Sequence, residues 1–229
     1  NLKIGENSFT ANATDVAGNT NSITSVVNRL PQDSDVPIVV AGLANDTGSS
    51  DSDLLTAAPS VTGTVSDDNA VTSLRAGFGE TSSQDFVDIT AALNSDTFVL
   101  DRAALEGING GPLSDGGQIL KLIATDEFGN ESEIFELPFT LDTQLSPLTL
   151  DLTAASDSDE LGDLQTTFET VTLEGITEPN AQVELQGAGL ATPLTMQSGE
   201  DGSYVFSDVV LTLGENPFTV AATDLAGNV

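Results

Sequence analysis

The motif Ala-Thr-Asp-x-x-Gly-Asn occurs three times in this chain, at residues 13–19, 124–130 and 222–228. The copies start 111 and 98 residues apart, and a repeat of about 100 residues is the size of one β-sandwich domain. Between the copies, short runs of alternating apolar and polar residues are separated by turn residues, and helical periodicity is weak. The sequence therefore predicts an all-β protein built from tandem sandwich domains.

The two ends of the chain are copies of the same part of a repeat. Residues 1–19 align with 210–228 without a gap, and 12 of the 19 positions are identical. We therefore expect a window on a longer protein, with three parts: 1–30 is the C-terminal hairpin of an upstream repeat, 31–141 is a complete domain, and 142–229 is a domain that lacks its last strand. Because a sandwich without that strand exposes an unpaired edge, either the natural protein continues or another chain supplies the strand.

Alternation places seven strands in the complete domain. They are predicted at 36–43, 60–66, 70–78, 85–89, 97–100, 118–125 and 132–141. An acidic loop covers 44–58, and a Gly-rich connection at 102–117 has room for one helical turn at 102–106. In the last domain, strands are predicted at 146–152, 168–175, 181–186, 194–197, 204–206 and 215–223.

Composition limits the possible chemistry. The chain has 5 Lys and Arg against 36 Asp and Glu, a net charge of −31, so nucleic acid and anionic membranes are poor partners. No apolar run approaches the roughly 20 residues of a membrane helix. Cys, His and Trp are absent, which removes thiolate and imidazole ligands, the commonest general base and a sugar platform. We predict no enzyme, and the abundant hard oxygen ligands favour Ca²⁺.

Several segments carry a family resemblance. Residues 2–19 and 211–228, together with 175–183 and 201–206, resemble the bacterial Ig-like repeats that build the stalks of giant secreted adhesins and related surface proteins. The resemblance implies Ig-like Greek-key β-sandwiches, an extracellular location at the cell surface, and Ca²⁺ at the domain junctions, as in RTX-adhesin-like stalk domains. Neighbouring repeats of the same or an identical chain are the expected partners. The middle repeat departs from the pattern at Glu127-Phe128 and in its longer 76–117 region.

Ig topology predicts where the acidic residues gather. The strand that carries the repeated motif ends at the N-terminal pole, beside the incoming linker, and the loop after the first strand lies at the opposite pole, facing the next linker. Each junction should therefore collect carboxylates from several segments, and Ca²⁺ accepts six to eight oxygens in flexible geometry. The candidate ligands are Asp33, Asp35, Asp46, Asp51, Asp53, Asp126, Asn130, Asp142, Asp157, Asp159, Asp163 and Asp224.

The acidic residues also have two roles that need no metal. In the repeated motif, Asp can cap the turn, Gly can take positive φ and Asn can bond its own backbone. The acidity as a whole can keep a salt-adapted protein soluble. The predicted function is a non-catalytic, Ca²⁺-stiffened spacer in a bacterial surface adhesin. The alternative is a subunit of a self-assembling extracellular filament or sheath, in which strand or lateral contacts join the repeats.

Overall fold

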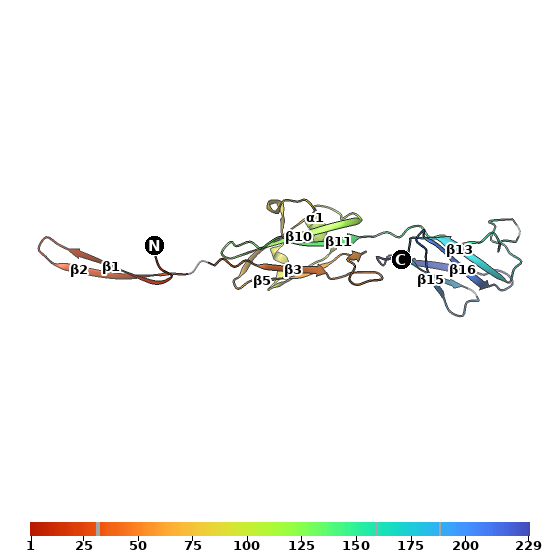
Figure 1. The fold of residues 1–229 in the computed structure, drawn as a ribbon, viewed down its shortest axis with the longest axis horizontal. Coiled ribbons are helices and arrows are strands. Elements are labelled where there is room, and N and C mark those ends of the chain that lie inside the picture. The colour runs from red at the N-terminus through yellow and green to blue at the C-terminus, as the bar shows by residue number, and fades with distance from the viewer. Residues whose placement is uncertain (31–32, 159, 188) are drawn as a thin grey trace.

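The computed structural model describes residues 1–30, 33–158, 160–187 and 189–229. Figure 1 shows three parts in a row: a hairpin at residues 1–30, a sandwich at 33–141 and a second sandwich at 142–229. We call these the hairpin, the middle domain and the third domain. Within the part of the chain that the structure describes, no helix is both long enough and apolar enough to cross a membrane.

The hairpin consists of β1 (Gly5–Thr14) and β2 (Thr20–Arg29), which pair antiparallel from Gly5↔Arg29 to Thr14↔Thr20. The two strands join at the first copy of the repeated motif. Its strand residues are exposed apart from the buried Asn7 and the half-buried Gly5, and the exposed residues include Phe9 and Ile23. The described hairpin thus has strand pairing but no core of its own.

The middle domain is a sandwich of two sheets. One sheet has the order β3 (Ile38–Leu43), β5 (Val61–Ser66), β9 (Thr97–Leu100), β8 (Leu93–Asn94). The other has the order β4 (Leu55–Thr56), β11 (Phe135–Leu141), β10 (Gly116–Asp126), β6 (Val71–Phe78), β7 (Val87–Asp88). Two 3₁₀ turns, η1 (Ser83–Asp85) and η2 (Thr90–Ala92), and the helix α1 (Arg102–Asn109) complete it. Alternate residues of the strands face inward and form one core, which includes Leu74, Phe98, Leu120 and Leu141.

The third domain repeats this arrangement with fewer strands. One sheet has the order β12 (Asp151–Leu152), β13 (Thr170–Ile176), β16 (Ser203–Val210), and the other has the order β15 (Leu194–Gln197), β14 (Gln182–Gly187), β17 (Phe218–Thr223). Its core gathers around Val183, Leu185, Tyr204 and Val209. The described residues therefore confirm the predicted all-β, tandem Ig-like sandwich fold.

Several elements differ from the predictions. The short strands β4 and β8 lie in segments predicted as loop, and α1 has eight residues rather than a single turn. The strand predicted at 132–141 begins only at Phe135. Before it, Ser132 contacts Ala124 of β10 through both its amide, which donates to the Ala124 carbonyl, and its hydroxyl, which accepts from the Ala124 amide. The strand predicted at 146–152 is reduced to Asp151–Leu152. Its earlier part still bonds to the sheet through the amide of Thr149, which donates to Ile176.

Candidate metal centres

The repeated motif forms the same turn at all three positions. In the middle domain, Asp126 Oδ1 accepts from the amide of Asn130 at 2.8 Å, and Asp126 Oδ2 accepts from Asn130 Nδ2 at 2.8 Å. The same pair of bonds joins Asp15 to Asn19 and Asp224 to Asn228. The glycine between them has φ close to +90° in each copy, a backbone conformation that favours glycine. Turn chemistry therefore accounts for the motif itself.

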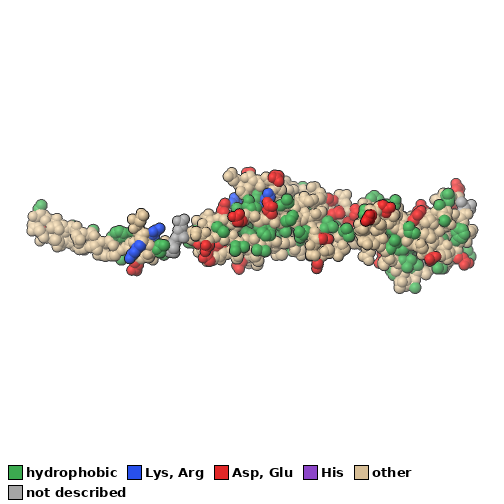
Figure 2. Space-filling view, viewed as in Figure 1, with side chains coloured by type: hydrophobic (Ala, Val, Ile, Leu, Met, Phe, Trp, Pro, Cys, Tyr) green, Lys and Arg blue, Asp and Glu red, His purple; other side chains and the backbone are tan. Residues whose placement is uncertain are grey.

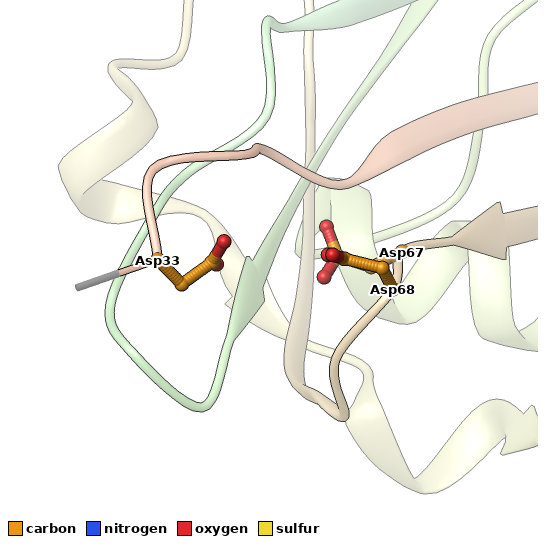
Figure 3. Close-up of side chains that lie close together, drawn as sticks. All are labelled: Asp33, Asp67 and Asp68. Carbon is orange, nitrogen blue, oxygen red and sulfur yellow. The ribbon is translucent and has the colours of Figure 1, made fainter. Parts of the chain in front are cut away.

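At the N-terminal pole of the middle domain, this turn meets the incoming linker. Asn130 Nδ2 also donates to Asp33 Oδ2 at 3.0 Å, so one amide holds the linker aspartate and the turn aspartate together. Across from Asp33 lie Asp67 and Asp68, from the turn between β5 and β6 (Figure 3). Carboxylate oxygens of Asp33, Asp67 and Asp68 all lie within 4.8 Å of one another. We call these three residues the first acidic cluster.

The electrostatics of this pole show how crowded its charges are. Asp68 is exposed, but partial desolvation by its neighbours raises its pKa above the ordinary value, and the charges of Asp33, Asp67 and Asp35 raise it further. For Asp126, burial acts in the same direction, but hydrogen bonds from Asn130 and Phe128 outweigh it, so the pKa of Asp126 lies below its ordinary value. The pole therefore crowds together carboxyl groups whose negative charges disfavour one another, which is the situation that a bound cation relieves.

The junction between the middle and third domains has an equivalent group. Carboxylate oxygens of Asp142, Glu178 and Asp224 lie within 4.8 Å of one another, and Asp224 is only 5% exposed. Asn228 Nδ2 donates to the backbone carbonyl of Asp142 at 3.0 Å. Glu178 Oε1 accepts from both the amide and the hydroxyl of Ser146, which holds the linker against the domain. We call Asp142, Glu178 and Asp224 the second acidic cluster.

The two clusters are assembled from matching parts of the repeat. Each takes one carboxylate from the linker and at least one from the turn between the second and third main strands. In each, the Asn of the repeated motif reaches across to the linker aspartate. The sequences Asp67-Asp68-Asn69-Ala70 and Glu178-Pro179-Asn180-Ala181 occupy corresponding turns. The recurrence indicates that the acidic pole is a property of the repeat.

The loop after β3 reaches from the middle domain to the third. The amide of Ser49 donates to the carbonyl of Leu225 at 3.3 Å, and the hydroxyl of Thr47 donates to the carbonyl of Ala226. A Cβ on Gly48, whose φ is +95°, would collide with the backbone of Leu225. The prediction that this loop faces the next domain therefore agrees with the geometry, although the contacts are backbone and hydroxyl contacts rather than carboxylates.

The other predicted ligands lie outside both clusters. Asp53 and Asp163 each accept a hydrogen bond from the backbone amide two residues further along. Asp51 is exposed. Asp35 lies outside the first cluster, although its charge helps to raise the pKa of Asp68. Asp159 lies outside the described residues. Asp46 Oδ2 accepts from Leu54 and Asp157 Oδ2 from Gly162. The second oxygen of each is buried without a hydrogen-bond partner among the described residues.

Sequence reasoning missed Asp67, Asp68 and Glu178. The signal was available, because in an Ig sandwich the turn between the second and third strands lies at the same pole as the turn of the repeated motif. The residue types in both clusters fit a calcium ion, which prefers oxygen ligands and carboxylates and tolerates irregular geometry. They do not fit zinc or copper, which favour nitrogen and sulfur.

Comparisons with known proteins give structural similarities only. No family model matches the chain, and no curated protein matches it. Among solved structures, it resembles latent PorU from Porphyromonas gingivalis, with 13% identity and a TM-score of 0.37 over 97% of this chain. The chain spans 23% of that PorU chain.

Two further structures show the same level of similarity. A 1.5-MDa bacterial ice-binding adhesin has 16% identity and a TM-score of 0.41, over 96% of this chain and 69% of that one. The fibronectin(III)-like modules of CbhA from Clostridium thermocellum have 16% identity and a TM-score of 0.37, over 82% and 88% of the two chains. Superpositions of this quality transfer no activity or ligand to the chain.

Proposed function

We propose that this segment is a non-catalytic spacer in the stalk of an extracellular bacterial adhesin, and that Ca²⁺ stiffens its domain junctions. The observation that carries the proposal is the recurrence of an acidic cluster at both described junctions. Each cluster joins a linker carboxylate to carboxylates of the domain that follows it. A cation bound there fixes the linker residue on the domain that follows, so less free linker remains between that domain and the part before it.

The chemistry of the clusters supports Ca²⁺ over a bulk salt effect. Three carboxylates within 4.8 Å of one another repel strongly unless an ion lies between them, and the buried Asp224 is partly shielded from mobile salt. Extracellular calcium modules bind with dissociation constants of about 10⁻⁴–10⁻³ M. At a hundredfold excess over that constant, each site adds about 2.7 kcal/mol to the stability of the folded state.

The resemblance of the hairpin sequence to adhesin stalk repeats supports the extracellular setting. A spacer needs repeated domains and junctions that resist bending, and it needs no binding site within the domains themselves. The described chain has this form, since its parts lie in a row (Figure 1) and its distinctive side chains gather where the parts meet. The proposal assigns the binding tip to sequence outside residues 1–229.

The test is a thermal melt combined with small-angle scattering of the whole segment, with Ca²⁺, with Mg²⁺ and after chelation. We expect a Ca²⁺-specific rise in melting temperature, together with a longer and more rigid particle. The variant Asp142→Asn/Glu178→Gln removes two ligands of the second cluster and should lose about half of the response.

The matched control is Asp151→Asn/Glu174→Gln, which removes the same charges from an exposed cross-strand pair of the same domain. It should respond to Ca²⁺ like the unmodified chain. Identical melts and scattering curves in Ca²⁺ and in chelator would overturn the proposal, and solubility alone would then account for the acidity.

A further inference from the structure

A single carboxylate, that of Asp115, holds the start of the linker between the middle and third domains. Asp115 Oδ1 accepts from the amide of Thr143 at 3.1 Å and from its hydroxyl at 2.9 Å, and Asp115 Oδ2 accepts from Gln144 Nε2 at 3.2 Å. Hydrogen bonds to a carboxylate are stronger than those between neutral groups. Both oxygens of Asp115 are therefore engaged with two consecutive linker residues.

The sheet of the middle domain places Asp115 at this position. In the ladder between β10 and β11, Gly116 pairs with Leu141 at the end where β11 runs into the linker (Figure 1). Asp115 comes one residue before β10, so the antiparallel register sets it beside the first residues that leave β11. The pairing of two long strands thus brings the carboxylate to Thr143.

The contacts of the linker divide it between the two domains. The amide of Asp142 donates to a backbone carbonyl of the middle domain at 3.1 Å, and the two residues after it are held by the carboxylate of Asp115. At the other end, Leu145 packs against the core of the third domain, and the amide and hydroxyl of Ser146 donate to Glu178. Each residue from 142 to 146 therefore contacts one domain or the other.

The carboxylate at this position is specific to the middle repeat. The three copies of the repeated motif start 111 and 98 residues apart, so Asp115 corresponds to Ile4 (115 − 111) and to Leu213 (115 + 98). The residue that follows is a glycine at positive φ in each copy, which supports this alignment. Ile and Leu side chains accept no hydrogen bond. Asp115 also lies near the end of the longer 76–117 region that distinguishes the middle repeat.

We propose that Asp115 is a positioning residue that fixes the linker to the middle domain. The second acidic cluster joins Asp142 to Glu178 and Asp224 of the third domain, so a cation there orients the linker on the domain that follows it. Asp115 orients the same linker on the domain that precedes it, and the junction is rigid only when both sides are fixed. The inference deepens the proposed function and rests on it for the importance of stiffness, but the contacts of Asp115 need no ion.

Asp115 holds the linker through neutral donors. On the visible face of the molecule, Figure 2 shows Asp and Glu but no Lys or Arg side chains where the middle domain meets the third, and residues 142–229 contain no Lys or Arg. Dissolved salt screens contacts between exposed charges. Thr143 and Gln144 carry no charge, so we expect their contact with Asp115 to depend little on ionic strength.

Distances between spin labels, measured by pulsed electron paramagnetic resonance, test this role. The chain has no cysteine, so Thr64→Cys in β5 and Val205→Cys in β16, both at exposed positions, place one label on each domain. Asp115→Leu, which introduces the residue type of the equivalent position in the third domain, should broaden the distance distribution both in Ca²⁺ and in chelator. Asp115→Asn keeps one acceptor oxygen for Thr143 and should broaden the distribution less.

The matched control is Asp96→Leu. It makes the same substitution at an exposed residue between β8 and β9, whose carbonyl accepts from Val65 at the end of the domain that carries the first acidic cluster. Its distance distribution should match that of the unmodified chain. Because Asp115 is exposed, Asp115→Leu should leave the melting temperatures of both domains unchanged, and this separates a loss of position from a loss of fold.

Equal distance distributions for Asp115→Leu and Asp96→Leu would overturn the inference, and so would a broadening that comes with a lower melting temperature of the middle domain. If Ca²⁺ narrows the distribution of the unmodified chain while Asp115→Leu has no effect, the spacer proposal stands and this inference fails. If Asp115→Leu broadens the distribution while Ca²⁺ has no effect, the role of Ca²⁺ fails and the role of Asp115 stands.

Discussion

Asp15, Asp126 and Asp224 occupy the same position of the same turn, yet their surroundings differ. All three accept the amide and the side chain of the Asn four residues on. Asp224 lies in an acidic cluster and Asp126 borders one through Asn130, while Asp15 is exposed and belongs to neither cluster. The turn therefore explains why the motif recurs, and the linker that approaches it explains where a cation site can arise.

Gly48 is the single residue on which the contact between the middle and third domains depends most directly. Its φ is +95°, and a side chain would collide with the backbone of Leu225. Gly48→Ala should break the bonds from Ser49 and Thr47 and loosen the junction, seen as a shorter maximum dimension in small-angle scattering. Gly162→Ala is the control. It also places a side chain at positive φ, with the same backbone strain of roughly 1–2 kcal/mol, but no atom lies near the new Cβ. Equal scattering changes from both variants would rule out a role for the contact.

Asp201 gives a pH dependence whose sign follows from its hydrogen bonds. The hydroxyl and the amide of Ser203 hold the pKa of Asp201 below its ordinary value. Its contribution to stability is therefore complete above the unfolded pKa of about 3.9 and is lost as the pH falls through the lower folded value. Asp201→Asn should lower the melting temperature of the third domain at pH 7, and the difference should shrink towards pH 3. A difference that is the same at both pH values would contradict this assignment, and Glu200→Gln is the control for charge.

At the scale of elements, the helix α1 shows how a connection becomes part of a core. Asp101 caps its first turn by accepting from the amide of Ala104, and Gly110 ends it in the left-handed conformation. Leu105 and Ile108 lie on its inner face and pack into the core of the middle domain. The helix thus covers part of the sandwich in the long region that distinguishes the middle repeat from the pattern of the others.

Truncation of the inner face of α1 should destabilise the middle domain alone. Leu105 is fully buried, so Leu105→Ala should cost about 2–5 kcal/mol. Ala103→Ser, on the exposed side of the same helix, should stay within about 0.5 kcal/mol. Chemical denaturation of both variants checks this, and a loss below about 1 kcal/mol for Leu105→Ala would show that the helix is not part of the cooperative unit.

The elements that the sequence predicts depend on local residue patterns, whereas the elements that it misses depend on long-range contacts. Long alternating runs such as 118–125 were predicted because period two survives wherever a strand has one buried face. β4 has only two residues, and it is fixed by parallel pairing with β11, a long-range contact that local alternation cannot show. The same holds for the clusters: Asp224 was predicted from the repeated motif, whereas Asp67 and Glu178 come to the clusters through the topology of the sandwich alone.

At the scale of the whole molecule, the two domains differ in how complete their cores are. The middle domain buries an inserted strand, β11, between β10 and β4, while the third domain leaves the corresponding space open. We expect calorimetry to show two transitions, with the third domain melting first. Leu105→Ala should move only the upper transition. A single transition would show that the two domains melt as one unit. A shift of the lower transition in Leu105→Ala would show that the middle domain melts first.

The position of the acidic clusters decides how far such a chain can extend. If each junction is held straight, the distance spanned by n repeats grows in proportion to n, but if each junction is a free hinge it grows only as the square root of n. If ions bridge Asp33 and Asp142 to their domains as proposed, their loss from an array of many repeats would leave the sandwiches in place but shorten the average distance between the two ends of the array. The concentration of divalent cations in the surrounding medium would then set the end-to-end distance of the array, although only a few carboxylates per repeat bind them.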